Sequence, residues 1–506
     1  MADALTLSSD ELALVGRLEQ RLSLYGSKNR TARNFFAGVF DPKNYGITVP
    51  PQMRVEHSVG WCSKVVNTIE ARLDFEGWAS PSDSNPFGLQ DIYNSNNLGV
   101  LSHQAHLDAL IYGCSFVVVG KGAPGEPDPL ITVESPLNMT AEYSLRTKRL
   151  TSALYHAKDD DEEVLTLYTP NETVYMARET GKPMQVINRV VHNLGRVPVV
   201  VLANGAHTER PFGHSEMTKS IRASTVEAVK TELNMSVNSE FYAAPQRYAL
   251  GVEEAAFKNP DGTAKNPWTF AQSKFLALGS QTDQDGNPVG TPQVGEFSQS
   301  SPTPYISVLQ YYARKVASDA DLPVRLFDEN KNAPTSADAI RADESALVKR
   351  CERKTAEFSL AWREVGLLAL LVRGGAPAEY PAISPQWKSP ATPTKAASTD
   401  AAVKLVATGI VPADSDVVLD AVDMSNIDKE RIKLDRAAAA STPNGKEDAE
   451  ALAAKFNALG TAIRAGVTPE SAAKAVGLSD LQFLNNVYPV TLHDTEDGNS
   501  LPNTAQ

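Results

Sequence analysis

The chain has 506 residues, of which 42% are hydrophobic and 22% charged, and its formal net charge is −13. This length favours three or four domains of ordinary size. The acidic balance argues against a protein whose bulk surface grips nucleic acid, because phosphate binding needs a surplus of Lys and Arg, but it does not exclude a surface past which nucleic acid slides.

Cysteine use and the N-terminal segment indicate a reduced protein that is not secreted. Cys62, Cys114 and Cys351 are few and widely spaced, which favours neither a disulfide framework nor a Cys-x-x-Cys metal site. The N-terminal segment lacks the basic flank and apolar core of a signal peptide, and no run of about 18 apolar residues occurs. We therefore expect reduced cysteines, no membrane span and a cytoplasmic location at synthesis.

The first 210 residues combine helical and strand patterns. A capped helix is predicted from Ser8 or Ser9, followed by a loop-rich arm over 25–41 and helices over 55–73 and 87–110. After Gly113 the apolar period changes to two, which predicts strands at residues 115–120, 130–135, 152–157, 163–168, 173–178 and 185–193. Gly and Pro turns separate these strands, as is typical of an antiparallel meander in a mixed α+β domain.

Two helices that enclose a compact module follow. The first opens at Pro211-Phe212-Gly213-His214-Ser215, with Ser215 as its N-cap, and ends near residue 241. Its thin apolar stripe is typical of a helix that packs beside neighbours. Turns and short strands are predicted over 244–304, and a second helix over 305–319. We expect the two helices to lie side by side, with the module at one end.

A polar loop over 322–334 leads into one long amphipathic helix over 336–373. Pro334 and a capping box at Ser336 mark its start, and Gly374-Gly375 marks its stop. At about 1.5 Å per residue the helix is on the order of 55 Å long. Its expected buried face consists of Ile340, Leu347, Cys351, Thr355, Phe358, Trp362, Val365, Ala369 and Val372.

The C-terminal part is predicted to be helical after a linker. Residues 376–395 contain five prolines, which predicts a linker. Beyond it, residues 402–425 and 459–479 share a pattern of helix, Gly stop, Pro at the next helix start and a Val-x-Met/Leu-Ser end. Whether this is a duplicated helical hairpin or a coincidence stays open. The tail is polar.

No catalytic, cofactor-binding or metal-binding signature is recognisable. The phosphate-binding loop G-x-x-x-x-G-K-[ST] is absent, and the segment at Ser215 lacks the second Gly of a nucleophile elbow. His103 and His106 lie three residues apart but have no nearby ligand partner, so we expect partly exposed structural histidines. The acidic run over 159–163 is interpreted as a hairpin tip, with a metal site as the alternative. We therefore expect no enzyme and no cofactor.

Three short motifs follow one another along the chain. They are Pro211-Phe212-Gly213 with Ser215, Ala244-Pro245-Gln246-Arg247, and Asp321-Leu322-Pro323 leading to Thr335-Ser336-Ala337-Asp338-Ala339-Ile340. In this order and spacing, the motifs resemble those of the portal proteins of tailed bacteriophages, in the siphovirus branch. The resemblance covers roughly residues 8–479, and it implies a ring, usually a dodecamer, at one capsid vertex.

The resemblance implies a multidomain α+β portal fold with defined parts. An α+β wing, a helical stem, a small α/β clip and an α-helical crown are expected. The implied boundaries are 1–210 for the N-terminal part of the wing, 211–243 for the first stem helix, 244–302 for the clip, 303–321 for the second stem helix, 322–335 for the tunnel loop, 336–375 for the long wing helix, 376–395 for the Pro-rich linker, 396–486 for the crown and 487–506 for the polar tail.

The resemblance also implies candidate contact residues of three kinds. The tunnel loop is expected to touch DNA weakly, since its charges nearly balance, through Arg325, Phe327, Asp328, Glu329, Asn330, Lys331 and Asn332. Channel-facing candidates on the stem are Lys219, Arg222, Lys230, Arg314 and Lys315. Partner-binding candidates on the clip are Arg247, Lys258, Lys265 and Lys274.

The implied function is that of a virion structural protein whose ring conducts double-stranded DNA. Such a ring serves genome packaging, retention and ejection, and it connects head to tail. The implied partners are further copies of the chain, double-stranded DNA bound without sequence preference, terminase, a head-tail adaptor protein, the major capsid protein and scaffold, with assembly in the host cytoplasm and no membrane contact. Two alternatives stay open: another ring-forming head or connector protein without a DNA-conducting role, and a soluble enzyme.

Overall fold

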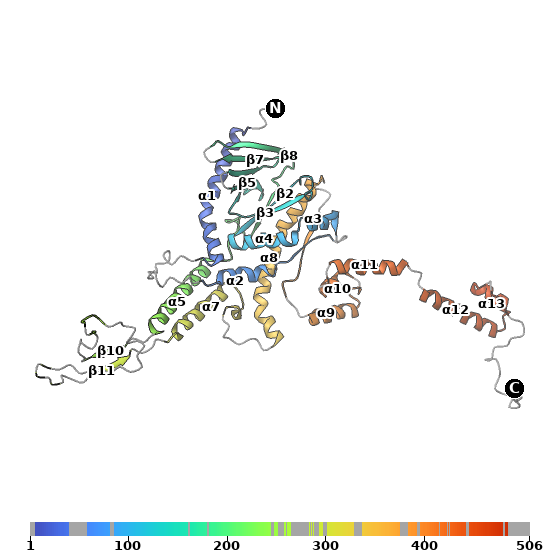
Figure 1. Ribbon diagram of the computed structural model, residues 1–506. Coiled ribbons are helices and arrows are strands. Elements are labelled where there is room, and N and C mark those ends of the chain that lie inside the picture. The colour runs from blue at the N-terminus through green and yellow to red at the C-terminus, as the bar shows by residue number, and fades with distance from the viewer. Residues whose placement is uncertain are drawn as a thin grey trace. The chain divides into compact units, whose positions relative to one another are not determined.

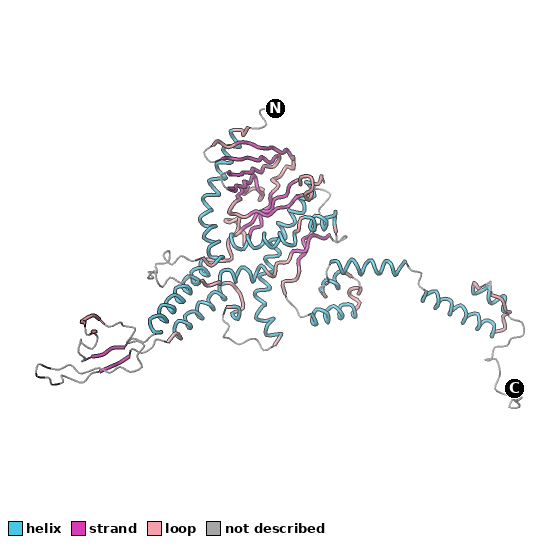
Figure 2. Tube along the Cα trace, viewed as in Figure 1, coloured by secondary structure: helices cyan, strands magenta, loops and turns pink. Residues whose placement is uncertain are grey.

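The fold is taken from a computed structural model, shown in Figure 1. It divides into two compact units, Met1–Thr392 and Pro393–Gln506, which are described separately. The described residues are 6–39, 58–80, 85–159, 162–179, 182–243, 247–250, 258–259, 261–264, 283, 285, 287, 293–296, 301–327, 336–374, 383–391, 395–413, 415–422, 424, 426–441, 445–478 and 481–483. The first unit contains both helices and strands, and helices make up the second, as Figure 2 shows.

Helix α1 (Ser9–Ala37) is longer than the sequence predicted. Ser8 forms the expected capping box with Glu11, and Gly38 ends the helix in a left-handed conformation, with φ 70°. The predicted loop-rich arm is therefore wrong for residues 25–37. The polar residues there are poor helix formers, but Gly26, Asn29 and Ala32 are buried at helical spacing, so tertiary packing overrides local propensity.

Two antiparallel sheets form the strand-rich part of the first unit. Three strands are ordered β3 (Leu130–Glu134), β2 (Cys114–Gly120) and β9 (Val199–Ala203). Five more are ordered as a meander, β4 (Met139–Tyr143), β5 (Leu150–Asp159), β6 (Glu162–Tyr168), β7 (Glu172–Glu179) and β8 (Gln185–Val191). The predicted meander is confirmed, and β4 is an addition to it. Asp159 pairs with Glu162, which confirms the acidic run as a hairpin tip.

Three helices precede and support the three-stranded sheet. α4 (Leu98–Tyr112) packs on the sheet. Two more helices pack on α4, namely α2 (Trp61–Glu70) and α3 (Leu89–Ser95). A 3-10 turn, η4 (Pro86–Gly88), precedes α3. The continuous helix predicted over 87–110 is wrong, because Asn97 adopts a positive φ of 52° between α3 and α4. The break is fixed by Asn96, whose buried amide donates to the carbonyls of Ile92 and Pro129 and accepts from the Ile131 amide.

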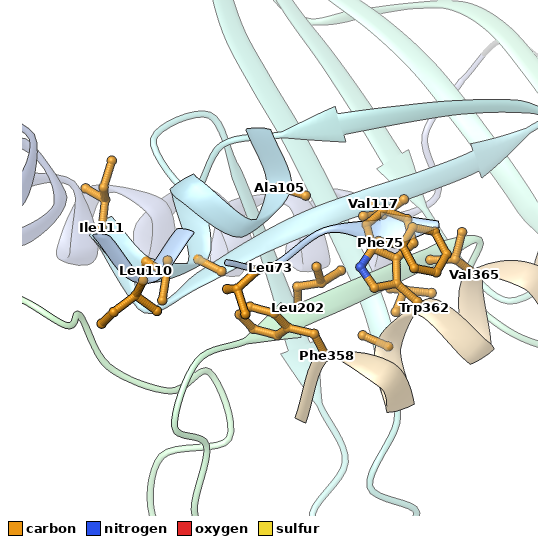
Figure 3. Close-up of a cluster of buried hydrophobic side chains, with 14 of the residues drawn as sticks. Leu73, Phe75, Ala105, Leu110, Ile111, Val117, Leu202, Phe358, Trp362 and Val365 are labelled. Carbon is orange, nitrogen blue, oxygen red and sulfur yellow. The ribbon is translucent and has the colours of Figure 1, made fainter. Parts of the chain in front are cut away.

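The long helix α8 (Ala337–Val372) agrees with its predicted bounds to within a residue. Ser336 caps it by accepting a hydrogen bond from the Ala339 amide at 3.2 Å. Figure 3 shows Phe358, Trp362 and Val365 pointing from α8 into the core of the first unit. Of the predicted buried face, Ile340 is 38% exposed, because the first turns of α8 lie beyond this core.

Part of the predicted linker is a strand. β12 (Ser384–Trp387) pairs antiparallel with β1 (Phe75–Ala79), a strand that the sequence did not predict, and Ile383 is buried beside it. The linker prediction over 376–395 is therefore wrong for residues 383–391. Proline is tolerated there because β12 has a single neighbour, so its second edge needs no donor.

Helices α5 (Lys219–Ala243) and α7 (Thr303–Asp319) lie side by side, as Figure 1 shows and as expected. The chain between them contains a two-stranded antiparallel ribbon of β10 (Arg247–Leu250) and β11 (Gln293–Glu296). α5 begins four residues after Ser215, so the predicted N-cap is wrong. The Ser215 hydroxyl accepts from the Met217 amide and lies 3.4 Å from the Leu110 carbonyl instead.

The second unit is helical, as predicted. Its helices are α9 (Lys395–Ala407), α10 (Asp416–Ala421), α11 (Asn426–Ser441), α12 (Gly445–Arg464) and α13 (Pro469–Val476). α9 packs on α10, and α12 packs on α13. Pro469 opens α13 as predicted. The matching prediction for Pro412 is wrong, because α10 begins four residues later and Ser415 caps it.

The two hairpins bury corresponding positions. Ala402 of α9 and Leu459 of α12 occupy the same place before the Gly stop, and both are buried. The pair Val418 and Leu419 of α10 corresponds to Ala472 and Ala473 of α13, all of them buried. Gly409 and Gly466 both have positive φ. These matches favour duplication over coincidence, with a longer connection in the first copy.

Candidate functional site

The paired helices α5 and α7 meet through small and apolar side chains. Ala313, Val316 and Ala317 of α7 are buried, as are Ile221 and Ala228 of α5. Small residues let two helix backbones approach closely, so a narrow stripe suffices for packing. The Ser220 hydroxyl also donates to the Asp319 carboxylate at 2.5 Å, which joins the start of α5 to the end of α7.

The five cationic candidates on these helices differ in their surroundings. Lys219, Arg314 and Lys315 are exposed. Arg222 is half-buried, and its guanidinium carbon lies 5.7 Å from the ring centroid of Phe35 on α1. Lys230 is half-buried and forms an ion pair with Glu227 at 2.9 Å. Three of the five side chains therefore face solvent, and the other two are held against the protein.

The candidates on the module between the helices are only partly described. Arg247 begins β10 and is in register with Glu296 of β11. Lys258 forms an isolated bridge with Ala264. Lys265 and Lys274 lie outside the described residues. Two of the four candidates, Arg247 and Lys258, thus belong to the described part of the chain.

The segment after α7 is anchored where it begins. Residues 322 and 323 are buried, and a 3-10 turn, η6 (Val324–Leu326), follows. Arg325 forms ion pairs with Asp343 at 3.0 Å and with Glu344, both on α8. Phe327 packs on the core of the first unit. Arg325 and Phe327 thus both contact other parts of the folded unit, and their expected contact with DNA stays a prediction.

Five further candidates in this segment lie outside the described residues, namely Asp328, Glu329, Asn330, Lys331 and Asn332. The anchor itself extends beyond α8, because Glu344 also pairs with Arg72 at 2.9 Å and Arg72 donates to the Pro390 carbonyl at 3.0 Å. The sequence did not predict this chain of contacts, since Arg72 lies 272 residues from Glu344 and 318 residues from Pro390.

A buried charged network joins α8 to the start of α5 and the end of α7. Glu216 is 1% exposed and accepts from Lys354 at 2.9 Å and from Arg350. Arg350 also donates to the Ala320 carbonyl at 2.6 Å and to Asp321 at 3.0 Å. Because one carboxylate receives two cations, the three helices are fixed together at this point.

The protonation state of Glu216 follows from these partners. Burial alone would raise the pKa of its carboxyl, but Lys354 and Arg350 outweigh burial and lower the pKa to about 2. Glu216 is therefore ionised at neutral pH. The sequence carried a signal that could have indicated the network: Arg350 and Lys354 stand four residues apart beside Cys351 on an otherwise apolar helix face.

The backbone around Gly213 supports this network. The Asn204 amide donates to the Gly113 carbonyl, and the His214 amide donates to the Asn204 carbonyl, each at 2.8 Å. The Asn204 side chain then donates to the carboxylate of Glu216 at 2.9 Å. Gly213 has a φ of 64°, and a Cβ atom there would lie 2.2 Å from the Asn204 carbonyl oxygen. Only glycine fits this crossing of three backbone segments.

His106 is fully buried, so the expected partial exposure is wrong for it, whereas His103 is half-buried beside Glu70. Trp362 donates to the Nε2 atom of His106 at 2.8 Å, which places the ring proton on Nδ1. Burial, and secondarily nearby His103, lowers the pKa of His106 to about 3. Within the described ranges no group of three His, Cys, Asp or Glu side chains could hold a metal ion.

The low pKa of His106 predicts acid-sensitive folding. In the unfolded chain a histidine takes up its proton near pH 6.5, whereas folded His106 stays neutral to about pH 3. Stability should therefore fall as the pH drops below 6.5, by about 2 kcal/mol between pH 7 and pH 5. Urea unfolding at the two pH values measures the loss. The variant His106→Gln can still accept from Trp362 but does not titrate, so an equally steep loss in it would contradict the assignment.

These features define a class of protein before any comparison. A folded α+β unit carries a projecting pair of helices, and the conspicuous buried charges tie helices together. No described helix is long and apolar enough to cross a membrane. The arrangement is that of a structural protein with a mechanical task.

Comparison with known proteins identifies the family. Residues 16–439 match the family model described as phage portal protein, SPP1 Gp6-like. The portal protein of Mycobacterium phage D29 is 31% identical over 415 residues, covering 78% of this chain and 83% of that protein. The portal protein of Mycobacterium phage L5 is 30% identical over 411 residues, covering 78% and 82%. The chain belongs to the SPP1 Gp6-like family of phage portal proteins and is not an enzyme.

Weak similarity to solved structures accompanies this assignment. The virion of a native gene transfer agent particle contains a chain with a TM-score of 0.40 and 15% identity, covering 78% of this chain and 93% of that chain. The neck of the empty particle gives a TM-score of 0.40 and 14% identity with the same coverage. Likeness at this level adds nothing to the family assignment.

Proposed function

We propose that copies of this chain form a ring-shaped channel, a dodecamer, at one capsid vertex, through which double-stranded DNA is packaged, retained and ejected. Membership of the portal family supports the vertex location and the link between head and tail. The observation that carries the channel is the α5 and α7 pair, which projects from the folded unit and is tied by Glu216, Arg350 and Asp321 to α8.

The parts of the chain then take the roles implied by the family. The α+β region to residue 210 and α8 make up the wing, α5 and α7 the stem, and residues 244–302 the clip. Residues 322–335 form the tunnel loop and 396–486 the crown. The exposed Lys219, Arg314 and Lys315 are the stem cations that best suit contact with phosphates passing through the channel.

The expected partners follow from these roles. The clip meets terminase during packaging and later a head-tail adaptor protein, and the major capsid protein and scaffold are further partners of the ring. Assembly takes place in the host cytoplasm. The rival function is that of a ring-forming connector that conducts no DNA.

The tunnel loop gives the decisive experiment for DNA conduction. Deleting residues 328–332 removes five loop residues and leaves the anchor at Arg325 intact. We expect purified rings to form as in the wild type, while particles assembled from the variant package or retain less DNA. Class averages of stained rings and the DNA content of heads measure the two effects. Normal DNA content would favour the rival connector, and a wild-type chain that stays monomeric would overturn the ring itself.

A further inference from the structure

The strongest surface that the proposed channel leaves unused is cationic. Residues 20–37, on α1, contain four basic residues and no acidic one, in a chain of net charge −13. The turn between β4 and β5, residues 144–149, adds Arg146, Lys148 and Arg149, again without an acidic residue. Neither segment belongs to α5, α7 or the segment after α7.

Side-chain contacts bring these two segments together. Arg17 of α1 forms an ion pair with Glu142 of β4 at 3.2 Å. One turn further along α1, the guanidinium of Arg21 lies 4.9 Å from the ring centroid of Phe212, and Phe212 lies 6.2 Å from the ring of Tyr143, the last residue of β4. The β4–β5 turn therefore begins next to the middle of α1.

We define the α1 basic surface by Arg21, Lys28, Arg146, Lys148 and Arg149. Lys28 stands two helical turns after Arg21, on the same side of α1. Lys28 and the three turn cations are exposed, and none of them forms an ion pair with a described residue. Cations of one sign on adjoining elements repel one another, so they stabilise the fold little and favour an anionic ligand.

The extent and chemistry of the surface point to a polymer. Arg21 and Lys28 are about 10 Å apart along the helix axis, whereas duplex DNA carries a charge about every 1.7 Å of its axis. The neighbouring exposed Ser27 on α1 carries a hydroxyl of the kind that contacts phosphate oxygens. A single phosphate or carboxylate would engage only one or two of these groups.

We propose that the α1 basic surface binds the phosphate backbone of double-stranded DNA without sequence preference, at a place distinct from the stem and the tunnel loop. The inference rests on the proposed function, because it supposes that the chain works beside DNA. It adds a second contact to that function: the channel residues meet DNA in passage, while the α1 basic surface holds DNA against the wing.

Salt-dependent binding of a mixed-sequence DNA duplex tests the inference. The test variant replaces Lys28, Arg146, Lys148 and Arg149 with Gln, and since all four are exposed and pair with no described residue, folding should be unchanged. We expect weaker binding at low salt and a slope of log affinity against log salt that is smaller by about 0.9 for each phosphate that is no longer neutralised. The control variant replaces four exposed cations elsewhere, Lys349, Arg353, Lys455 and Lys474, with Gln.

The two variants carry the same change in net charge, so only location differs between them. A smaller slope in the test variant alone supports the inference. If both variants show the same slope, or if the slope of the test variant equals that of the wild type, the inference is overturned. Rings that still form in that case leave the proposed channel intact. If the test variant binds DNA normally but no longer forms rings, the surface contacts an acidic part of a second copy, and the inference is likewise overturned.

Discussion

Replacing Glu216 with Ala should reduce the free energy of unfolding by about 3–5 kcal/mol. The substitution leaves Arg350 and Lys354 without their shared carboxylate, and Lys354 is only 6% exposed. Arg350 keeps Asp321 and Lys354 keeps a longer contact with Glu357 at 3.5 Å. Neither of these carboxylates is buried as Glu216 is, so the two cations lose most of the charge that compensates their burial. Urea unfolding of the purified chain at neutral pH measures the loss.

An exposed ion pair on the same helix provides the matched control. Glu364 of α8 pairs with Arg196 at 2.9 Å, but its side chain is 42% exposed. Glu364→Ala should therefore cost less than about 1 kcal/mol. If Glu216→Ala proves no more destabilising than Glu364→Ala, the network does not hold the three helices together.

The position of this network makes it relevant to DNA conduction. Glu216 lies three residues before α5, and Asp321 two residues after α7, while both cations belong to α8. Any force on the paired helices is therefore transmitted to α8 through ionic contacts in addition to apolar packing. The segment after α7 is fixed a second time by Arg325 on Asp343. The proposed tunnel loop thus starts from a rigid base that extends to Phe327.

Elements with a regular local pattern were predictable from the sequence. α8 was found almost to the residue, because its apolar positions recur at three and four residues and Ser336 supplies a cap. The meander was found because alternation and turns recur from β5 to β8. Both signals are contained within about ten to forty neighbouring residues, which is the range over which a periodic pattern can be recognised.

Features that depend on distant partners were not predictable. β1 pairs with β12 through Phe75 and Trp387, which are more than 300 residues apart in the sequence. Neither segment shows the alternation of apolar and polar residues that predicts a strand. The bond from Arg350 to Glu216 spans 134 residues. The C-terminal half of α1 is helical because its small residues pack on the fold, not because of propensity. The candidate site was therefore located by family resemblance. The ion pairs that hold it, from Arg325 to Asp343 and from Arg350 to Glu216, were found only in the structure.

Substituting Gly213 with Ala should destabilise the folded chain by more than about 3 kcal/mol. Two effects add: a non-glycine residue in the left-handed region costs about 1–2 kcal/mol, and the new Cβ would lie 2.2 Å from the Asn204 carbonyl oxygen and 2.6 Å from the Gly113 carbonyl oxygen. Those atoms belong to backbone that is hydrogen-bonded on both sides, so relief requires moving β9 or the end of α4, which cores resist. Thermal and urea unfolding measure the loss.

The control for Gly213→Ala is a glycine with the same backbone and no crowding. Gly195 has a φ of 66°, against 64° for Gly213, and a Cβ there would meet no atom within 4 Å. Gly195→Ala should therefore show the conformational cost alone, about 1–2 kcal/mol. The difference between the losses of Gly213→Ala and Gly195→Ala measures the free-energy cost of crowding at the backbone crossing. Asn204 donates to Glu216 at 2.9 Å. We therefore expect this difference to shrink in a chain that already carries Glu216→Ala. Equal losses for the two glycines would show that the crossing can open without cost, and that the Pro211-Phe212-Gly213 motif needs glycine for its φ angle only.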